Sequence, residues 1–315
     1  MKTNSFSPID WLIKFKIAPQ NKSGFRELRA EIFQQTVEVI KQGGYTSDGV
    51  SIKFDKDRTT KETYFYKKPS PLIPPQFKND TKFNVIDADC LETVEILKKD
   101  GYNVCLLNMA NRRNPGGGVL GGAGAQEENI FRRSNLFQSL YQFVAYADEY
   151  EVLRNSENSY PLDRNTGGIY SKSVRIFRGS EKKGYCFLQN PFDISVVSVP
   201  AINHPDLDFI DGLYYISEAM IEPSKEKIRT ILRICGAFNH DCLVLSAFGC
   251  GAFGNPPNHM AKLFKDVFNE DEFQGRFKTI VFAILDDHNT RKEHNPEGNI
   301  LPFSRMFNGT SSLIP

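Results

Sequence analysis

The first 80 residues contain two different hydrophobic patterns followed by a proline-rich segment. Between residues 24 and 43, apolar residues recur every three or four positions, which predicts an amphipathic helix that ends at two glycines. Alternating and β-branched residues at 45–66 surround Asp48-Gly49, which is typical of a hairpin turn. The segment 67–76, KKPSPLIPPQ, holds four prolines and is predicted to be a linker without regular structure.

From about residue 82, short apolar runs alternate with longer amphipathic runs. This alternation predicts an α/β fold with a mixed, mostly parallel central sheet covered by helices on both faces. The predicted strands are 83–87, 103–109, 194–200, 242–248 and 279–285, and the predicted helices are 91–100, 128–147, 217–238 and 258–269. We expect residues 1–80 to form a helical and hairpin accessory region and 81–315 to form the main domain, with an insertion at 150–190 that is rich in Asn, Ser, Gly and Tyr.

The composition places the chain among ordinary globular proteins. It has 40% hydrophobic residues, 24% charged residues and a net charge of +1, so no whole-protein field recruits nucleic acid or membrane. Six cysteines without a CxxC pair favour reduced thiols, and five histidines without HExxH spacing predict no structural zinc. No signal peptide or membrane helix is apparent. The expected location is cytoplasmic, with the nucleus or export without a cleaved signal as alternatives.

Two predicted strands end in glycine-rich loops that lead into helices. The loop at 114–122 reads NPGGGVLGG, and the loop at 249–256 reads GCGAFGNP. Missing side chains let backbone N–H groups approach an anion, and a helix N-terminus adds a favourable dipole. Two such loops after parallel strands predict a diphosphate held from both sides, although each loop alone could be a tight strand-to-helix turn. Each loop also matches GxGxxG, so a dinucleotide-binding domain is a competing interpretation.

An acidic pair follows the first loop, so that residues 116–128 read GGGVLGGAGAQEE. Two carboxylates at a helix start are most simply partners of the helix dipole. A carboxylate near a diphosphate anchor can also reach the sugar at its far end, where a general acid can cleave a glycosidic bond through an oxocarbenium-like state. Because Glu127 and Glu128 are neighbours, they would divide the work between holding hydroxyls and transferring the proton.

These residues resemble the microbial type of poly(ADP-ribose) glycohydrolase, an enzyme family with a macrodomain fold. Its signature is GGG, a short spacer and QEE, and here the spacer is VLGGAGA (119–125). LNMAN (107–111), SAFGCGAFGNPP (246–257) and NVIDADCLETVEIL (84–97) support the resemblance. It implies a macrodomain-like three-layer α/β/α domain that cleaves the ribose–ribose O-glycosidic bonds of poly(ADP-ribose) and releases ADP-ribose.

The resemblance also implies a role for individual residues. Glu128 would be the general acid and base, Glu127 would hold ribose hydroxyls, and Gln126 would orient the pair. Asp89 is expected to hold the adenine N6, with Asp87 as a close competitor. The further expected substrate contacts are Asn111, Gly117, Gly118, Val119, Gly249, Gly251, Ala252, Phe253 and Gly254. The resemblance implies neither a metal nor an organic cofactor, and we expect a monomer without a membrane partner, with ADP-ribose as product.

Other interpretations remain open at this point. One is a hydrolase that removes a single ADP-ribose from protein or nucleic acid. Another is a macrodomain that binds ADP-ribose without cutting it, which has no need of the QEE pair. The absence of GK[ST] and GxSxG disfavours a P-loop NTPase and an α/β-hydrolase. The basic segment 174–183, VRIFRGSEKK, is expected to be a solvated hairpin rather than a contact to polymer phosphates.

Overall fold

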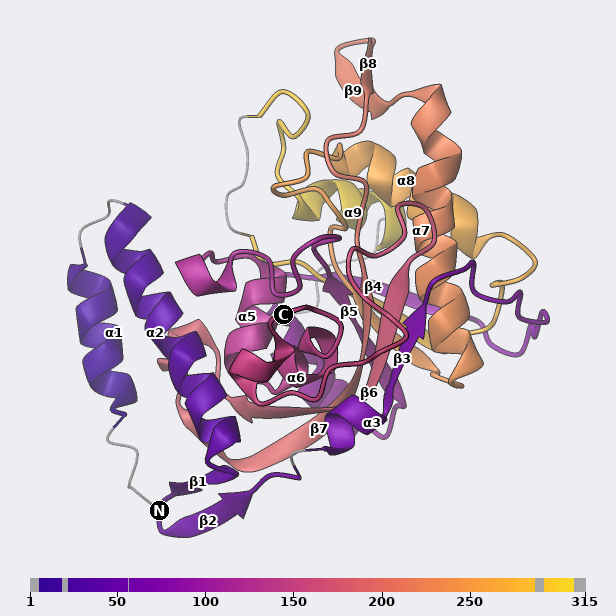
Figure 1. The fold of residues 1–315 in the computed structure, drawn as a ribbon. Helices are drawn as coiled ribbons and strands as arrows, with labels where there is room; N and C mark the ends of the chain where they lie inside the picture. The colour runs from indigo at the N-terminus through magenta and orange to yellow at the C-terminus, as the bar shows by residue number, and fades with distance from the viewer. Residues whose placement is uncertain (1–5, 19–21, 56, 287–291, 309–315) are drawn as a thin grey trace. The chain divides into compact units, whose positions relative to one another are not determined.

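The computed structural model describes residues 6–18, 22–55, 57–286 and 292–308 (Figure 1). The chain divides into two compact units, and each unit combines segments that are distant in sequence. The first unit consists of Met1–Phe65, Ala110–Leu162 and Ile169–Val196, and the second consists of Tyr66–Met109, Asp163–Gly168 and Val197–Pro315. The division near residue 80 and the insertion at 150–190 stay predictions.

The first unit contains two long N-terminal helices, a hairpin and three sheet strands. Its elements are α1 (Pro8–Ile17), α2 (Lys22–Lys41), β1 (Gly44–Ser47), β2 (Val50–Lys53), α3 (Arg58–Lys61), β3 (Thr63–Tyr66), the 3-10 helix η1 (Val119–Gly121), α5 (Gln126–Arg133), α6 (Leu136–Tyr141), η2 (Ala147–Tyr150), β6 (Gly168–Arg178), η3 (Glu181–Lys183) and β7 (Phe187–Val199). Helix α2 confirms the predicted helix, and Figure 1 shows α1 beside it, although the hydrophobic pattern does not predict α1. The β1–β2 hairpin turns at Asp48 and Gly49, both with positive φ.

Strands β3, β6 and β7 lie in that order in the sheet of the first unit. β6 and β7 are antiparallel, because the connection between them is too short for a parallel crossover. The N–H of Gly179 donates to the carbonyl of Cys186 at 2.8 Å in this connection. The segment 174–183 therefore is a hairpin, as expected, but the guanidinium of Arg178 is buried between Phe6 and Phe187 instead of solvated.

The predicted single helix at 128–147 is divided into α5 and α6. Ser134 has extended backbone angles and forms an isolated bridge with Ile176 of β6. The side-chain Oδ1 of Asn135 accepts the N–H of Arg175 at 2.8 Å, and its own N–H donates to the carbonyl of Arg175. The backbone at 134–135 thus pairs with a strand, which the helical period of the sequence could not reveal.

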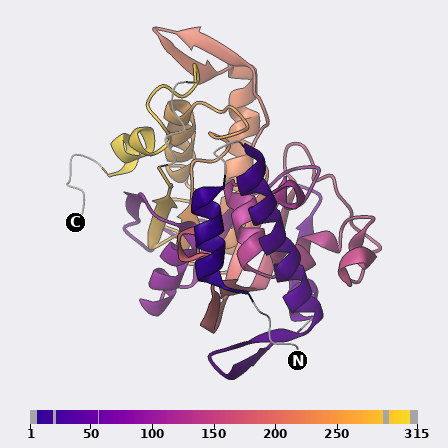
Figure 2. The ribbon, with the colours of Figure 1, turned by 90° about the vertical axis from the view of Figure 1, so that its left-hand side faces the viewer.

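The second unit contains the parallel part of the sheet. Its elements are β4 (Lys82–Ile86), α4 (Cys90–Lys99), β5 (Val104–Met109), β8 (Leu207–Ile210), β9 (Leu213–Ile216), α7 (Glu218–Ala237), β10 (Cys242–Leu245), α8 (Pro257–Phe268), β11 (Thr279–Ala283) and α9 (Ile300–Phe307). The strand order is β5-β10-β11-β4, and every pair in it is parallel. The predicted α/β class with a mixed, mostly parallel sheet is confirmed. The hydrophobic pattern missed α9 and the β8–β9 hairpin, which extends beyond the first turn of α7 (Figure 2).

An aromatic core and hydrogen bonds from a side chain to the backbone of an edge strand stabilise the second unit. The rings of Phe264, Phe282 and Phe303 pack together between α8, β11 and α9. The amide of Asn308, which directly follows α9, accepts the N–H of Val85 at 2.8 Å and donates to its carbonyl at 3.1 Å. Asn308 therefore forms hydrogen bonds with backbone groups of β4. β4 is an edge strand, and unpaired backbone groups on such a strand can promote aggregation.

All six cysteines are free thiols, as predicted, and five of them are buried. Within the described ranges no helix is both long and apolar enough to cross a bilayer. The same ranges hold no cluster of three or more His, Cys, Asp and Glu side chains that could bind a metal ion.

The proline-rich segment 67–76 lacks helix and strand, as predicted, yet it is anchored. The carboxylate of Glu272 accepts two bonds from the guanidinium of Arg233, at 2.8 and 2.9 Å, and a third from the N–H of Ile73 at 3.1 Å. Burial alone would raise the pKa of Glu272, but the bonds from Arg233 and Ile73 lower it below its usual value. The stability from this carboxylate is therefore present above its unfolded pKa and lost as the pH falls through its folded pKa.

Glu272→Gln is expected to lower the free energy of unfolding by about 2 kcal/mol near neutral pH, because the charge-assisted hydrogen bonds from Arg233 are lost. The deficit should shrink at acidic pH, as the pH falls through the folded pKa of Glu272 and the wild-type carboxyl also takes up a proton. Urea denaturation at both pH values measures this. Glu222→Gln, which alters a mostly exposed partner of Arg229, is the control and should change stability little. A deficit that does not depend on pH would contradict the assignment.

Candidate active site

The segment before the first glycine loop is shaped by Asn111. Its side-chain Oδ1 accepts the backbone N–H groups of Arg113 and Asn114 at 2.9 and 3.0 Å, which forms an Asx turn. Its own backbone N–H donates to Oε2 of Glu127 at 2.8 Å. Asn111 therefore contributes to the site through its backbone, and its expected contact to ribose stays a prediction.

The two carboxylates lie in the first turn of α5 and are held differently. Glu127 is only 4% exposed and Glu128 only 7%. Both oxygens of Glu127 accept backbone N–H groups, Oε2 from Asn111 and Oε1 from Gly116 at 3.1 Å. Oε1 of Glu128 accepts the N–H of Gly118 at 2.8 Å, and its Oε2 has no hydrogen-bond partner in the part of the chain that the structure describes. Glu128 thus keeps one oxygen for a ligand.

Gly117 lies where the two carboxylates meet. Its φ is +56°, and a Cβ atom there would lie 2.4 Å from Oε1 of Glu128 and 3.3 Å from Oε2 of Glu127. No side chain fits at this distance, so the glycine is required by close approach as well as by its backbone conformation. Val119, the next predicted contact after Gly118, is buried and begins η1.

The glycine loop uses part of its N–H groups on the protein's own carboxylates. The sequence predicts that such groups hold a diphosphate, but those of Gly116 and Gly118 donate to Glu127 and Glu128. The N–H of Gly117 donates to the carbonyl of Asn114 at 2.9 Å. In the first unit the loop therefore acts as a cradle for the acidic pair, and its predicted contact with a diphosphate stays a prediction.

Tyr160 is a residue of the site that the sequence pattern missed. Burial raises the pKa of its phenol, and the negative charge of Glu127, which lies close enough to act on it, raises the pKa further. Its hydroxyl is buried and has no hydrogen-bond partner within the described residues. Tyr160 lies in the Asn- and Ser-rich segment at 150–190, where no period or motif marks it.

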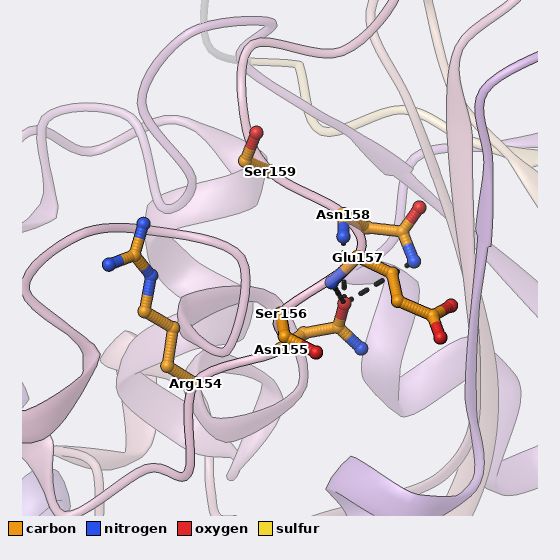
Figure 3. A pocket seen from close by; sticks show the side chains of 6 residues that line it. All are labelled: Arg154, Asn155, Ser156, Glu157, Asn158 and Ser159. Atoms are coloured by element: carbon orange, nitrogen blue, oxygen red, sulfur yellow. Dashed lines mark hydrogen bonds between the residues drawn. The ribbon is translucent and has the colours of Figure 1, made fainter.

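A polar hollow of about 410 Å³ directly precedes Tyr160 in the chain and is lined by residues 154–159 (Figure 3). The side-chain Oδ1 of Asn155 accepts the N–H groups of Glu157 and Asn158 at 3.0 and 2.8 Å, so this loop is held by its own turn. None of the residues predicted from the sequence lines this hollow.

The second glycine loop belongs to the second unit and keeps free donors. Asn255 is fully buried, and its side-chain amide donates to the carbonyls of Ile202 and Gly249 at 2.8 and 3.1 Å. A Cβ on Gly249 would lie 2.5 Å from that amide nitrogen, and its φ is +74°. Among the described residues, no acceptor binds the backbone N–H groups of three successive positions, Gly251, Ala252 and Phe253. Successive free N–H groups of this kind are typical of an anion-binding loop.

The remaining predicted residues have local structural roles. Oδ1 of Asp89 caps α4 by accepting the N–H groups of Leu91 and Glu92, both at 3.0 Å. Its competitor Asp87 accepts the N–H of Asp286 at 2.9 Å. Gln126 is partly exposed at the start of α5, and Gly254, at φ +71°, ends the second loop. The predicted roles of Asp89 and Gln126 toward a substrate stay predictions.

The chain is similar to known proteins both in sequence and in fold. The profile of the family described as microbial-type PARG, catalytic domain, matches residues 33–179, which include the whole GGG–QEE segment. The poly(ADP-ribose) glycohydrolase of Thermomonospora curvata, solved with the inhibitor ADP-HPD, is 27% identical with a TM-score of 0.68, over 90% of this chain and 100% of that chain. The Deinococcus radiodurans enzyme, solved with ADP-ribose, is 25% identical with a TM-score of 0.59, over 80% and 97%. No curated protein sequence matches the chain.

Fold and site together define a macrodomain-like α/β protein with a buried carboxylate pair cradled by a glycine loop. Within that class, the similarity to the microbial-type poly(ADP-ribose) glycohydrolases, indicated first by the GGG–QEE segment, is confirmed.

Gly117→Ala is expected to lower catalytic activity by about 100-fold, because a carboxylate displaced by roughly 1 Å loses its productive geometry. ADP-ribose release from poly(ADP-ribose) measures this loss. Gly121→Ala is the matched control: a Cβ there meets no atom within 4 Å, so activity should change less than about twofold. Equal activity of the two variants would contradict the conclusion that the Glu128 carboxylate requires glycine at position 117.

Proposed function

We propose that the chain is a poly(ADP-ribose) glycohydrolase, which cleaves ribose–ribose O-glycosidic bonds and releases ADP-ribose. The family profile and the two solved enzymes support this class of reaction. One observation supports Glu128 as the residue that transfers the proton: both oxygens of Glu127 accept backbone N–H groups, whereas Oε2 of Glu128 is left without a partner in the described residues. A general acid needs one oxygen that reaches the substrate.

Glu128 would act first as acid and then as base. Its proton passes to the oxygen of the leaving ribose as the glycosidic bond breaks, and the sugar develops oxocarbenium character. A water molecule then attacks the anomeric carbon and gives its proton to the Glu128 carboxylate, which restores the starting state. The N–H of Gly118 on Oε1 fixes the carboxyl group through both steps. The negative diphosphate of the substrate itself would stabilise the positive charge that develops on the sugar.

Glu127 would bind and not react. Each carboxylate oxygen has two lone pairs, so both oxygens can accept a ribose hydroxyl in addition to the N–H groups of Asn111 and Gly116. Fixed in this way, Glu127 would hold the sugar beside Glu128. Gln126, one position before, would orient the pair.

The other substrate contacts are proposed from the sequence and from local geometry. The free N–H groups of Gly251, Ala252 and Phe253 would bind the diphosphate, with Gly249 and Gly254 supporting the loop. Gly117, Gly118 and Val119 would lie along the distal ribose. The carboxylate of Asp89 would accept a hydrogen bond from the adenine N6 amine. We further propose a cytoplasmic location, which agrees with six free cysteines.

Removal of a single ADP-ribose from a protein or nucleic acid is the alternative reaction for the same site, since the same glycosidic carbon is attacked. A non-catalytic ADP-ribose binder is disfavoured, because a buried carboxylate with an unoccupied oxygen is costly to retain and has no use in mere binding.

Glu128→Gln is expected to lower the rate of ADP-ribose release by about 1,000-fold, because the amide retains shape and hydrogen bonding but cannot transfer the proton. Wild type and variant are incubated with defined poly(ADP-ribose) and with mono-ADP-ribosylated protein, and free ADP-ribose is quantified. Glu95→Gln, on the exposed side of α4, is the matched control. Release from neither substrate by wild type would overturn the enzyme assignment, and equal rates for wild type and Glu128→Gln would overturn the role of Glu128.

A further inference from the structure

We infer that the N-terminal helices α1 and α2 position the catalytic loop through a partly buried chain of polar contacts that joins Arg29, Glu181, Tyr185 and Arg132. This inference rests on the proposed function of Glu128 and adds positioning residues that no motif marks. Helix α2 lies beside α5, as Figure 1 shows, and it also contacts η1.

Arg132 connects the spacer of the GGG–QEE segment to the β6–β7 turn. It lies one helical turn after Glu128 and is 1% exposed. Its Nη1 donates to the carbonyl of Ala123 at 2.7 Å, and its Nε donates to the hydroxyl of Tyr185 at 2.9 Å. The backbone carbonyl of Arg132 accepts the hydroxyl of Thr36 in α2. One planar guanidinium therefore fixes the spacer and the turn in the same geometry.

The chain of contacts continues from Tyr185 to helix α2. The hydroxyl of Tyr185 donates to Oε2 of Glu181 at 3.0 Å, and Glu181 accepts Nε and Nη2 of Arg29 at 2.7 and 2.8 Å. Burial would raise the pKa of Glu181, but the bond and charge of Arg29 hold it below its usual value. Glu181 therefore stays ionised near neutral pH and orients both of its partners.

Helix α1 closes this cluster from one side. The indole of Trp11 meets the ring of Tyr185 edge to face at 5.1 Å, and its Nε1 donates to the carbonyl of Leu28 at 3.2 Å. The guanidinium of Arg29 lies over the ring of Phe15 at 5.5 Å. The apolar face of α1 thus partly shields the contacts from water, which strengthens them.

The spacer also lies directly against α2. A Cβ on Gly122 would lie 1.7 Å from the backbone carbonyl oxygen of Arg26, and a Cβ on Gly124 would lie 2.5 Å from Nη1 of Arg29. Gly122 is therefore required by the approach of the α2 backbone, whereas a side chain at Gly124 would displace the guanidinium of Arg29. The spacer is glycine-rich for a packing reason that the sequence alone did not separate from ligand binding.

Two backbone bonds link the spacer to the catalytic carboxylate. Arg132 holds the carbonyl of Ala123, the N–H of Ala123 donates to the carbonyl of Gly118 at 3.1 Å, and the N–H of Gly118 holds Oε1 of Glu128. A shift of Ala123 would therefore move the group that orients Glu128. Arg132, Tyr185, Glu181 and Arg29 are positioning residues, because they act through this backbone.

Tyr185→Phe tests the inference, because it keeps the ring against Trp11 and removes only the hydroxyl between Arg132 and Glu181. The rate constant kcat should fall about tenfold with KM within about twofold, since orientation and not binding is lost. Amide exchange within 116–128 should rise about tenfold as the spacer loosens. Tyr170→Phe is the matched control, because it removes another buried hydroxyl of the first unit, which donates to Ser195 at 3.0 Å.

The inference fails if Tyr185→Phe leaves both kcat and exchange within 116–128 unchanged, or if Tyr170→Phe changes both equally. All rates are taken where both variants are fully folded by circular dichroism. Failure of the proposed function is distinguishable, because it would appear as no ADP-ribose release by wild type. The exchange measurement tests the polar contacts in that case as well.

A second observation independently assigns the hydroxyl of Tyr160 to substrate binding. A buried hydroxyl without a protein partner costs about 1–3 kcal/mol, so its retention calls for a ligand or an ordered water. Leu162, two residues later, exchanges bonds with Arg112, the neighbour of Asn111, which places this segment beside Glu127. We propose that the hydroxyl binds a ribose hydroxyl next to the one held by Glu127.

Tyr160→Phe is expected to leave the melting temperature unchanged or higher, because it removes an unpaired polar group. KM for poly(ADP-ribose) should rise about tenfold, the equivalent of one hydrogen bond. The same Tyr170→Phe control should lower the melting temperature and leave KM unchanged. A lower melting temperature with unchanged KM for Tyr160→Phe would show that the hydroxyl binds a structural water instead, and would overturn the proposal.

Discussion

Three backbone N–H groups, those of Asn111, Gly116 and Gly118, hold the carboxylates of Glu127 and Glu128 in a nearly water-free position. Burying two neighbouring carboxylates costs several kcal/mol each, and charge-assisted bonds of about 1.5–3 kcal/mol each offset much of that cost. The N-terminal turn of α5 adds its dipole. Without these donors the pair could not remain buried, and Glu128 would have no fixed direction for its free oxygen.

The two glycine loops look alike in sequence but serve different purposes. In the first, glycine permits close approach by the protein itself: carboxylates at Gly117, the ring of Phe131 at Gly116 and the backbone of α2 at Gly122. In the second, Asn255 folds the loop so that three successive N–H groups are left without an acceptor in the described residues. The first loop therefore prepares the chemistry, whereas the second is suited to hold an anion.

The N-terminal helices are part of this preparation. Helix α2 approaches the spacer closely enough to demand glycine at position 122, and it contributes Arg29 to the polar contacts that end on Ala123. The β6–β7 turn supplies the middle of those contacts through Glu181 and Tyr185. In the inferred arrangement, these segments would orient the acid through the backbone, because directional hydrogen bonds join them to the spacer.

The sequence by itself determined the local features: helix α2, the strands of the parallel sheet, the proline-rich segment, and the adjacency of glycine loop and acidic pair. All of these depend on neighbours within a few positions, so hydrophobic period and motif spacing reveal them. Only the tertiary structure decided that α5 ends at Arg133 so that Ser134 meets β6, that backbone N–H groups bond both oxygens of Glu127 but only one of Glu128, and that Arg29 pairs with Glu181 across 152 positions. Directional contacts between distant segments follow from how the chain packs, and no periodic pattern along the sequence records them.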